Sequence, residues 1–559
     1  MEYGARLSAP VSVFRITTAA EAAARDRAAI GAGTPSFDLM LHAGTAAAAY
    51  ILREPPDRLA YGVALFAGVG NNGGDAYIVA AQLARAGVPA RMHAHLPPRT
   101  TDAQRAAQLA APWLVYGAPT GHELLVVDGL LGTGHNGALR DGMWAECARL
   151  VRARDRGALV VALDIPSGLD ASTGEVAHGS VAADVTLSFG TIKRGALLRR
   201  DHVGQVVLLD IGLGECAHAP GDGNDAAWCW ATGASLCDIL GTVYESDAWN
   251  AHKGVRGRVG LAGGDHGMAG AVVLAARAAL QAGAGLVHGI VDEASVSAVQ
   301  ALVPQALAHR WPVQPASRHA EQSGRALSHP TPSQANAEPR YDALAIGPGL
   351  GRGKASAMVM PRLLDLYRGT PLVLDADALW LAADAANALG TDTASMLRHW
   401  TREAPQVVCT PHPGEFARLL GVPLPSEWDE RAALLSQFAT RANCTVLLKG
   451  TPTLVASSSG EPLWVVPHGT PMLATGGSGD CLTGVIATLL AQGASARDAA
   501  VVGATWHGRA AERATAERGT TRGMTLDDML HALGPVWASF ERDTPHAVGV
   551  LAELPAVRR

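Results

Sequence analysis

Short apolar runs alternate with longer stretches of helical periodicity through the first 215 residues. Six runs have strand length: residues 61–67, 90–95, 123–128, 158–164, 184–189 and 203–209. Runs this short and this continuously apolar are typical of parallel strands covered on both faces. Thr18 and Glu21 have the spacing of a capping box ahead of an Ala-rich helix. The pattern predicts an α/β domain with helices on both sides of a parallel sheet.

Three of these runs end in glycine-rich loops that also carry Asn or Asp, at residues 68–75, 127–134 and 163–168. Parallel strands bring their carboxyl ends to one edge of the sheet, and ligands bind there in open α/β sheets. The sequence therefore predicts a polar site at that edge. The first loop lacks the GxGxxG spacing of a dinucleotide-binding fingerprint, which argues against a plain Rossmann dehydrogenase.

A second series of apolar runs begins at residue 257. It covers residues 257–264, 343–347, 371–375, 406–409 and 445–449, and residues 456–466 suggest a hairpin. Residues 216–244 are linker-like in composition, and residues 313–340 are rich in Ser, Pro, Ala, Gln and His, as in an exposed insertion. The two series share no motif. We therefore expect two different α/β domains, at residues 1–215 and 245–545, and not a duplication.

Composition narrows the class of protein. The 559 residues are 48% hydrophobic and 17% charged, with a net charge of -6 that gives no hint of nucleic-acid binding. The seven cysteines include no CxxC pair, so neither a disulfide framework nor a zinc site is indicated, and a reducing cytoplasm fits. No basic and apolar leader is visible. The apolar stretch 269–287 carries Arg277 and Gln281, which favours a buried helix over a membrane span.

Lysine is rare: the chain has only Lys193, Lys253, Lys354 and Lys449, and arginine supplies its other basic side chains. All four lysines lie beside glycine-rich segments. We interpret some of them as positions where a compact ammonium is needed and a planar guanidinium would not fit.

The trio NNGGD (residues 71–75), VDGLLGTG (127–134) and DIPSG (164–168) resembles the N-terminal domain of the NAD(P)H-hydrate epimerases. The resemblance covers roughly residues 10–215. It implies a Rossmann-like three-layer domain that interconverts the R and S forms of hydrated NADH and NADPH (NADHX and NADPHX).

The same resemblance assigns residues. The hydrate would be held by Asp164 and by two loop segments: Asn71, Asn72, Gly73, Gly74 and Asp75, and Gly132, Thr133, Gly134, His135, Asn136, Gly137 and Ala138. Asn72, Asp128 and Ser167 would hold K⁺, since all three offer oxygen atoms to a hard cation. Epimerisation through ring opening, or through water loss and return, needs a proton shuttle and a nearby negative charge. Asp164 is the candidate for that role, and Lys193 would bind phosphate or assist proton transfer.

In the second half, residues 474–485 (ATGGSGDCLTGV) join a glycine-rich loop to an apolar helix. Successive N–H groups at a helix start form an anion site, suited to a transferring phosphoryl group. A carboxylate there can accept the proton of a substrate hydroxyl, as a kinase base does. Asp480 is therefore the candidate catalytic residue, against the alternative that it merely caps the helix.

Six further segments precede this loop: HKG (252–254), MAGA (268–271), GPGLG (347–351), DADAL (375–379), TPHPGE (410–415) and KGTPT (449–453). In this order they resemble the ADP- or ATP-dependent NAD(P)H-hydrate dehydratases, which have the ribokinase-like fold. The resemblance covers about residues 245–540. In such enzymes the hydroxyl of the hydrate is phosphorylated and phosphate then leaves, which restores the dihydronicotinamide.

This second resemblance implies binding roles. The nucleotide would be bound by Lys449, Gly450, Thr451, Pro452, Thr453 and Gly479, and the hydrate by Gly270, Gly349, His412 and Asp480. Glu415 would help to position Mg²⁺ through water, because His412 and Glu415 have the spacing of the ribokinase-like Asn-x-x-Glu motif. For Asp375 and Asp377, a structural role and a place in the substrate wall both stay open.

Together the two resemblances imply a bifunctional repair enzyme that acts on NADHX and NADPHX with ADP or ATP, with no nucleic-acid or membrane partner, and as a homo-oligomer. Two alternatives remain open: a ribokinase-like small-molecule kinase with a regulatory N-terminal domain, and an N-terminal half that serves only as a scaffold. Neither the ADP-versus-ATP choice nor the NADHX-versus-NADPHX choice is fixed by the sequence.

Overall fold

The computed structural model describes residues 13–213, 228–231, 249, 251–312, 340–460, 462–540 and 549–556. The chain divides into two compact units: unit 1 is Met1–Ser235 with Arg542–Arg559, and unit 2 is Leu236–Glu541. The expected linker 216–244 lies outside the described residues except for 228–231, and the expected insertion 313–340 does so except for Arg340.

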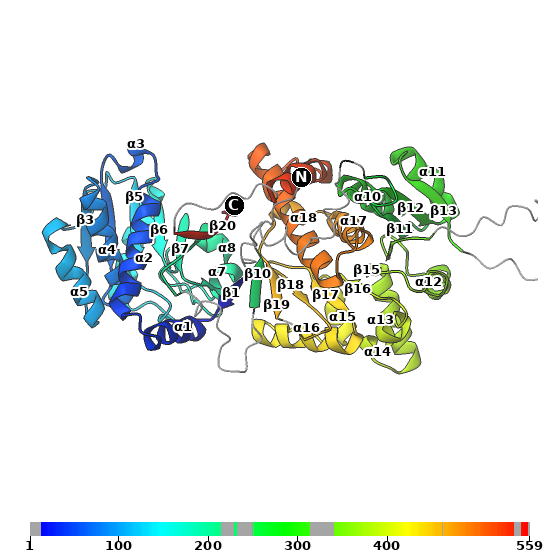
Figure 1. The fold of residues 1–559 in the computed structure, drawn as a ribbon, viewed down its shortest axis with the longest axis horizontal. Coiled ribbons are helices and arrows are strands. Elements are labelled where there is room, and N and C mark those ends of the chain that lie inside the picture. Colours follow the sequence, from blue (N-terminus) through cyan, green and yellow to red (C-terminus); the bar gives the residue numbers. More distant parts are fainter. Residues whose placement is uncertain are drawn as a thin grey trace, which may run out of the picture. The chain divides into compact units, whose positions relative to one another are not determined.

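Unit 1 contains a sheet with the strand order β20-β9-β7-β6-β5-β2-β3-β4 (Figure 1). Its strands are β2 (Val63–Ala67), β3 (Ala90–Ala94), β4 (Val115–Tyr116), β5 (Leu125–Gly129), β6 (Leu159–Leu163), β7 (Val185–Phe189), β9 (Gln205–Leu209) and β20 (Val550–Leu554). All neighbours are parallel except β20, which runs antiparallel to β9. The six strands expected from the apolar runs are confirmed within one or two residues at each end.

The helices of unit 1 are α1 (Ala19–Gly31), α2 (Ser36–Ile51), α3 (Pro56–Leu59), α4 (Asn71–Arg85), α5 (Thr101–Ala110), α6 (Asp141–Asp155), α7 (Arg194–Leu198) and α8 (Arg200–Val203). Side chains of β2 alternate between two cores: Leu65 packs with α2 and α4 residues, whereas Phe66 packs with residues of α6. The sheet is therefore covered on both faces, as expected for a three-layer α/β domain.

A small ribbon completes unit 1. Strand β1 (Val13–Thr17) pairs antiparallel with β10 (Trp228–Ala231) and parallel with β8 (Ile192–Lys193). Thr18 then caps α1 through the expected capping box: its hydroxyl accepts from the Glu21 N–H at 3.2 Å, and the Glu21 carboxylate accepts from the Thr18 N–H at 2.7 Å. The ribbon thus fixes both the start of α1 and the position of Lys193.

Unit 2 has strands in the order β13-β12-β11-β14-β15-β16-β17-β18-β19. They are β11 (Arg258–Gly263), β12 (Leu286–Val291), β13 (Leu307–Arg310), β14 (Ala343–Ile346), β15 (Leu372–Leu374), β16 (Val407–Cys409), β17 (Thr445–Leu448), β18 (Thr453–Ala456) and β19 (Leu463–Val466). The run from β13 to β17 is parallel, and β17, β18 and β19 are antiparallel. The hairpin begins at Thr453, earlier than the expected residue 456.

The helices of unit 2 are α10 (Ala269–Gln281), α11 (Glu293–Leu302), α12 (Lys354–Leu366), α13 (Asp377–Leu389), α14 (Thr393–Trp400), α15 (Pro413–Leu420), α16 (Trp428–Ala442), α17 (Ser478–Ala491), α18 (Ala496–Arg518) and α19 (Leu526–Phe540). Helices α10, α17 and α18 contact one face of the sheet, and α13, α15 and α16 lie on its other side (Figure 1). Within the described residues, no helix is long and apolar enough to cross a membrane.

Candidate active sites

A cavity of about 910 Å³ in unit 1 opens where α1 and α2 meet the loops that follow β2, β5 and β6. Most of the expected hydrate-binding residues line it: Asn71, Asn72, Asp75, Gly132, Thr133, Gly134, His135, Asn136, Ala138 and Asp164. Lys193, expected to bind phosphate or assist proton transfer, lines it too. The polar site expected at the carboxyl edge of the sheet therefore lies in a cavity. Gly73, Gly74 and Gly137 are not among its lining residues.

The two glycines of NNGGD serve helix packing. The motif is not a loop, as the sequence suggested, but the first turn of α4, which begins at Asn71. A Cβ on Gly73 would lie 2.0 Å from the carbonyl oxygen of Gly68, and one on Gly74 would lie 2.6 Å from Cε of Met40. The backbone contact requires glycine at position 73, and the packing leaves Asn72 and Asp75 to line the cavity.

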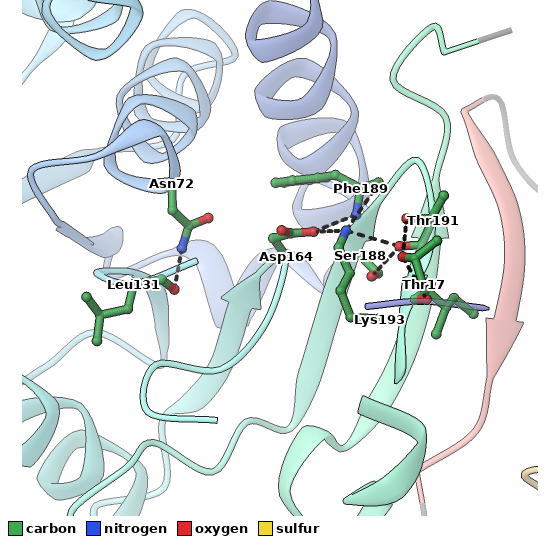
Figure 2. A network of polar contacts seen from close by, with 9 residues as sticks. Thr17, Asn72, Leu131, Asp164, Ser188, Phe189, Thr191 and Lys193 are labelled. Atoms are coloured by element: carbon green, nitrogen blue, oxygen red, sulfur yellow. Dashed lines mark hydrogen bonds and ion pairs between the residues drawn. The ribbon is translucent and has the colours of Figure 1, made fainter. Parts of the chain in front are cut away.

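Lys193 and Asp164 form the central ion pair of this cavity (Figure 2). The Lys193 Nζ donates to Asp164 Oδ1, to the Phe189 carbonyl at 2.9 Å and to the Thr191 carbonyl at 3.1 Å. These three acceptors use all the donors of the ammonium. Asp164 directly follows β6 and has a φ of 63°, an uncommon backbone state for a residue with a side chain. The strained turn and the fixed ammonium together orient the carboxylate.

The three expected K⁺ ligands are brought together by one hydrogen-bond chain through Leu131. Asn72 Nδ2 donates to the Leu131 carbonyl at 2.8 Å (Figure 2), and the Leu131 N–H donates to Ser167 Oγ at 2.9 Å. Ser167 Oγ in turn donates to Asp128 Oδ1 at 2.6 Å. Among the described residues, the buried Asn72 Oδ1 accepts no hydrogen bond. Such an oxygen fits a cation.

Two further carboxyl groups face the Asp164–Lys193 pair. Asp75 on α4 is 8% exposed, and no side-chain hydrogen bond to it is found within the described residues. Burial raises its pKa well above the usual value, and the charges of Asp164 and Asp26 add to that rise. Asp26 on α1 also lines the cavity, where desolvation raises its pKa. Asp26 is not marked by the sequence, because it lies in an Ala-rich helix whose one motif, the capping box of Thr18 and Glu21, serves the helix start.

In unit 2, Asp480 lies in the first turn of α17, which begins at Ser478 after Gly477 with a φ of 95°. Burial raises the pKa of Asp480 to about 7, with a further contribution from Asp375 and an opposing one from Lys449. A carboxylate with this pKa accepts protons efficiently near neutral pH. The expected base thus has the environment of a functional group, not of a solvated helix cap.

Asp375 organises the surroundings of Asp480. Lys449 Nζ donates to Asp375 Oδ1 at 2.7 Å, and Thr483 Oγ1 donates to Asp375 Oδ2 at 2.8 Å. A Cβ on Gly479 would lie 3.1 Å from Lys449 Nζ, so glycine lets the ammonium approach the helix start. Asp375 therefore orients Lys449 at the anion site. Asp377 instead accepts from the Gly351 N–H at 2.9 Å and pairs with Arg352.

His412 and Glu415 form a reciprocal helix cap. His412 Nδ1 accepts from the N–H groups of Gly414 and Glu415 at 3.0 and 3.3 Å, and Glu415 Oε2 accepts from the His412 N–H at 2.9 Å. Their spacing thus has a structural use at the start of α15. The charge of Glu415 also acts on Asp480, where it raises the pKa.

The other expected binding residues of unit 2 lie at helix starts and turns. Gly270 is exposed in the first turn of α10, and the space beside it is open. Gly349 has a φ of +59°, and a Cβ there would lie 2.7 Å from the Met268 carbonyl oxygen, so it abuts the same helix start. Thr453 Oγ1 donates to the Gly450 carbonyl at 3.1 Å and closes the turn that contains Thr451 and Pro452.

Comparison with known proteins agrees with this geometry. The profile of the NAD(P)H-hydrate dehydratase family matches residues 259–534, and that of the YjeF-related protein N-terminus matches residues 36–195. The bifunctional NAD(P)H-hydrate repair enzyme of Leishmania braziliensis is 35% identical over 83% of this chain and 83% of its own. The repair enzyme Nnr of Moorella thermoacetica is 33% identical over 94% of this chain and 97% of its own.

A solved structure, the ADP/ATP-dependent NAD(P)H-hydrate dehydratase from Bacillus subtilis co-crystallised with ATP/Mg²⁺, is 28% identical, with a TM-score of 0.42 over 52% of this chain and 92% of that chain. The identity of the two repair enzymes extends across both units of the chain. The chain therefore belongs to the family of bifunctional NAD(P)H-hydrate repair enzymes.

Proposed function

We propose that unit 1 interconverts the R and S forms of hydrated NADH and NADPH, and that unit 2 dehydrates the S form with ADP or ATP. The observation that carries the proposal is the placement of Asp480. It is a partly buried carboxyl with a pKa of about 7 at the start of α17, beside a lysine fixed by a second aspartate. Such a group can take a proton from a hydroxyl while the helix start holds a phosphoryl group.

In this scheme, phosphorylation converts the hydroxyl of the hydrate into a good leaving group. Hydroxide is a poor leaving group and phosphate is a good one. Asp480 would remove the proton of the hydrate hydroxyl as that oxygen attacks the terminal phosphorus of the nucleotide. Lys449 would stabilise the transferring charge. Loss of phosphate, with loss of a proton from the adjacent ring carbon, then restores the dihydronicotinamide, and the net result is hydrolysis of the nucleotide and repair of the cofactor.

Mg²⁺ suits this site because carboxylates outnumber the lysine there. The charges of Asp375, Asp377 and Glu415 all raise the pKa of Asp480, and among the described residues only the charge of Lys449 lowers it. A divalent cation that enters with the nucleotide would relieve this excess and neutralise phosphate oxygens. We propose that Glu415 contributes through water, since its Oε2 already caps α15.

In unit 1, we propose that Asn72, Asp128 and Ser167 hold K⁺. The unpartnered Asn72 oxygen and the nearby Asp128 carboxylate supply the hard oxygen donors that such a cation needs. The ion would supply positive charge that offsets buried Asp128 and holds the loops after β5 and β6 together. No group of three or more His, Cys, Asp or Glu in the described residues suits a metal. We therefore expect amide and hydroxyl oxygens to coordinate K⁺ together with the Asp128 carboxylate.

Basic and acidic side chains lie in different parts of the cavity, which suits a dinucleotide. Exposed Arg99 and Arg140 line its outer part, whereas Asp75 and Asp164 lie in its buried part. Basic side chains there would receive the phosphates of the hydrate. The carboxyl groups would surround the hydrated ring, where positive charge develops as water or the ring nitrogen departs.

Two variants test the division of labour. We expect Asp480→Asn to abolish nucleotide-dependent dehydration of the purified S hydrate while R-to-S interconversion continues at the wild-type rate. Asp164→Asn is expected to do the reverse. Chromatographic separation of the hydrates measures interconversion, and the dihydronicotinamide absorbance measures dehydration. A stable phosphorylated product with no recovered NADH would instead identify a small-molecule kinase.

A further inference from the structure

Asp75 is the most deeply buried of the four carboxyl groups that line the unit 1 cavity. Helix α4 carries it, α1 carries Asp26, α5 carries Asp102 and Asp164 follows β6, so four separate elements bring carboxyl groups to one cavity. Lys193 is bound to Asp164, and Asp75 has no ion-pair partner within the described residues. One fixed ammonium thus serves one carboxylate, and the buried Asp75 is left in the cavity without such a partner among the described side chains, whereas Asp26 is exposed.

Electrostatics then separates the roles of the carboxyl groups. Asp164 is held in an ion pair with Lys193, while Asp75 is desolvated and faces like charge from Asp164 and Asp26. Like-charged neighbours and burial both favour the neutral acid. When two carboxyl groups in one site have environments that differ in this way, one commonly acts as an acid and the other as a stabilising anion.

We propose that Asp75 is the general acid of epimerisation, with the Lys193-bound Asp164 as the anion that stabilises the cationic intermediate. This inference rests on the proposed epimerase function of unit 1. It assigns Asp75 a chemical role beyond holding the hydrate, and it assigns Asp26 the role of a positioning residue that keeps the proton on Asp75.

The step balances as follows. The Asp75 carboxyl donates its proton to the hydroxyl oxygen on the hydrated carbon. The C–O bond breaks, its electron pair leaves with water, and the lone pair of the ring nitrogen forms a C=N bond. Water then adds to the other face of the same carbon and returns a proton to the Asp75 carboxylate. No oxidant, reductant or net proton is required.

The first test is Asp75→Asn in the full-length chain, which keeps the size of the side chain but removes its acidic proton. We expect kcat for R-to-S interconversion to fall about 10²- to 10⁴-fold with KM changed by less than about threefold. Dehydration of the S hydrate should be unchanged. A kcat within about threefold of wild type would overturn the proposal, as would a rise in KM alone, which describes a binding residue.

Asp26→Asn provides a second test, the pH profile of kcat/KM, which should not change if Asp75 has only a structural role. The charged groups that act on Asp75 are Asp164, Asp26 and Lys193, and Arg27 also acts on Asp26. Removing the Asp26 charge lets Asp75 lose its proton more readily. The alkaline limb of kcat/KM should therefore move to lower pH. A limb that does not move contradicts its assignment to Asp75.

Stability provides the folding control. A buried acid with a raised pKa binds its proton more tightly in the folded state, so its contribution to stability is lost as pH rises through that pKa. Asp75→Asn should therefore unfold at a temperature at least equal to wild type at pH 8, with a weaker dependence on pH. A variant destabilised at pH 8 would contradict the assignment of a neutral Asp75.

Asp57→Asn is the matched control, because Asp57 is an exposed carboxylate of α3 outside the cavity, and it should behave as wild type. Failure of this inference is distinct from failure of the proposed function. If the wild-type chain does not interconvert the hydrates at all, the epimerase function fails. If the wild type and Asp75→Asn interconvert them equally, only the role of Asp75 fails.

Discussion

At the scale of single residues, scarce lysines mark both candidate sites. Two of the four lysines form an ion pair with an aspartate. Lys193 binds Asp164, which lies in a strained turn, and Lys449 binds Asp375, which is buried. The sequence predicted functional lysines from their rarity and their glycine-rich surroundings. It left the role of Asp375 open, because only the fold brings residue 375, after β15, to residue 449, after β17, with β16 between the two strands.

The pKa of Asp480 predicts how dehydration depends on pH. Asp480 must be ionised to accept a proton, so kcat/KM for dehydration should rise about tenfold per pH unit up to about 7 and then level. Lys449→Met removes the charge that lowers this pKa, and the acid limb should move to higher pH. Lys354→Met, at an exposed position on α12, is the control. A limb that stays in place in Lys449→Met would argue against Asp480 as the base.

At the scale of elements, the apolar runs predicted most of the central strands of both units, because those strands are buried on both faces. They did not predict β12, whose first residues fall in the stretch 269–287 that was expected to be helical, or the short strands β4, β8 and β13. They also did not predict β1, β10 and β20, each of which pairs with a strand far along the chain, as β20 does with β9, so the local pattern carries little of the signal. The NNGGD segment was expected as a loop, whereas packing of its glycines against Gly68 and Met40 allows it to be helical.

The C-terminal strand gives a stability prediction. Leu554 of β20 is 0% exposed, although it lies more than 300 residues from its partner strand. Leu554→Ala should destabilise unit 1 by about 2–5 kcal/mol and leave unit 2 unaffected. Leu389→Ala, 73% exposed at the end of α13, is the control. Calorimetry would check the result, and a lowered transition of unit 2 alone would contradict the assignment of β20 to unit 1.

At the scale of the whole molecule, one chain carries two complementary chemistries in two separate units. In each unit, a set of parallel strands ends at a polar site, and each site contains an ion pair between a lysine and an aspartate. Family motifs in the sequence identified most of the residues at both sites. The neutral Asp75, the neighbouring Asp26 and the Asp375–Thr483 contact required the fold, because they depend on burial and on charges from distant segments.

The most direct test starts from a mixture of R and S hydrates of NADH or NADPH with the full-length chain and either ADP or ATP. We predict that the dihydronicotinamide absorbance recovers to the full amount of both epimers, after subtraction of any interconversion in buffer. With Asp164→Asn, recovery should stop at the S share. Absence of recovery, with a stable phosphorylated small molecule in its place, would contradict the repair function.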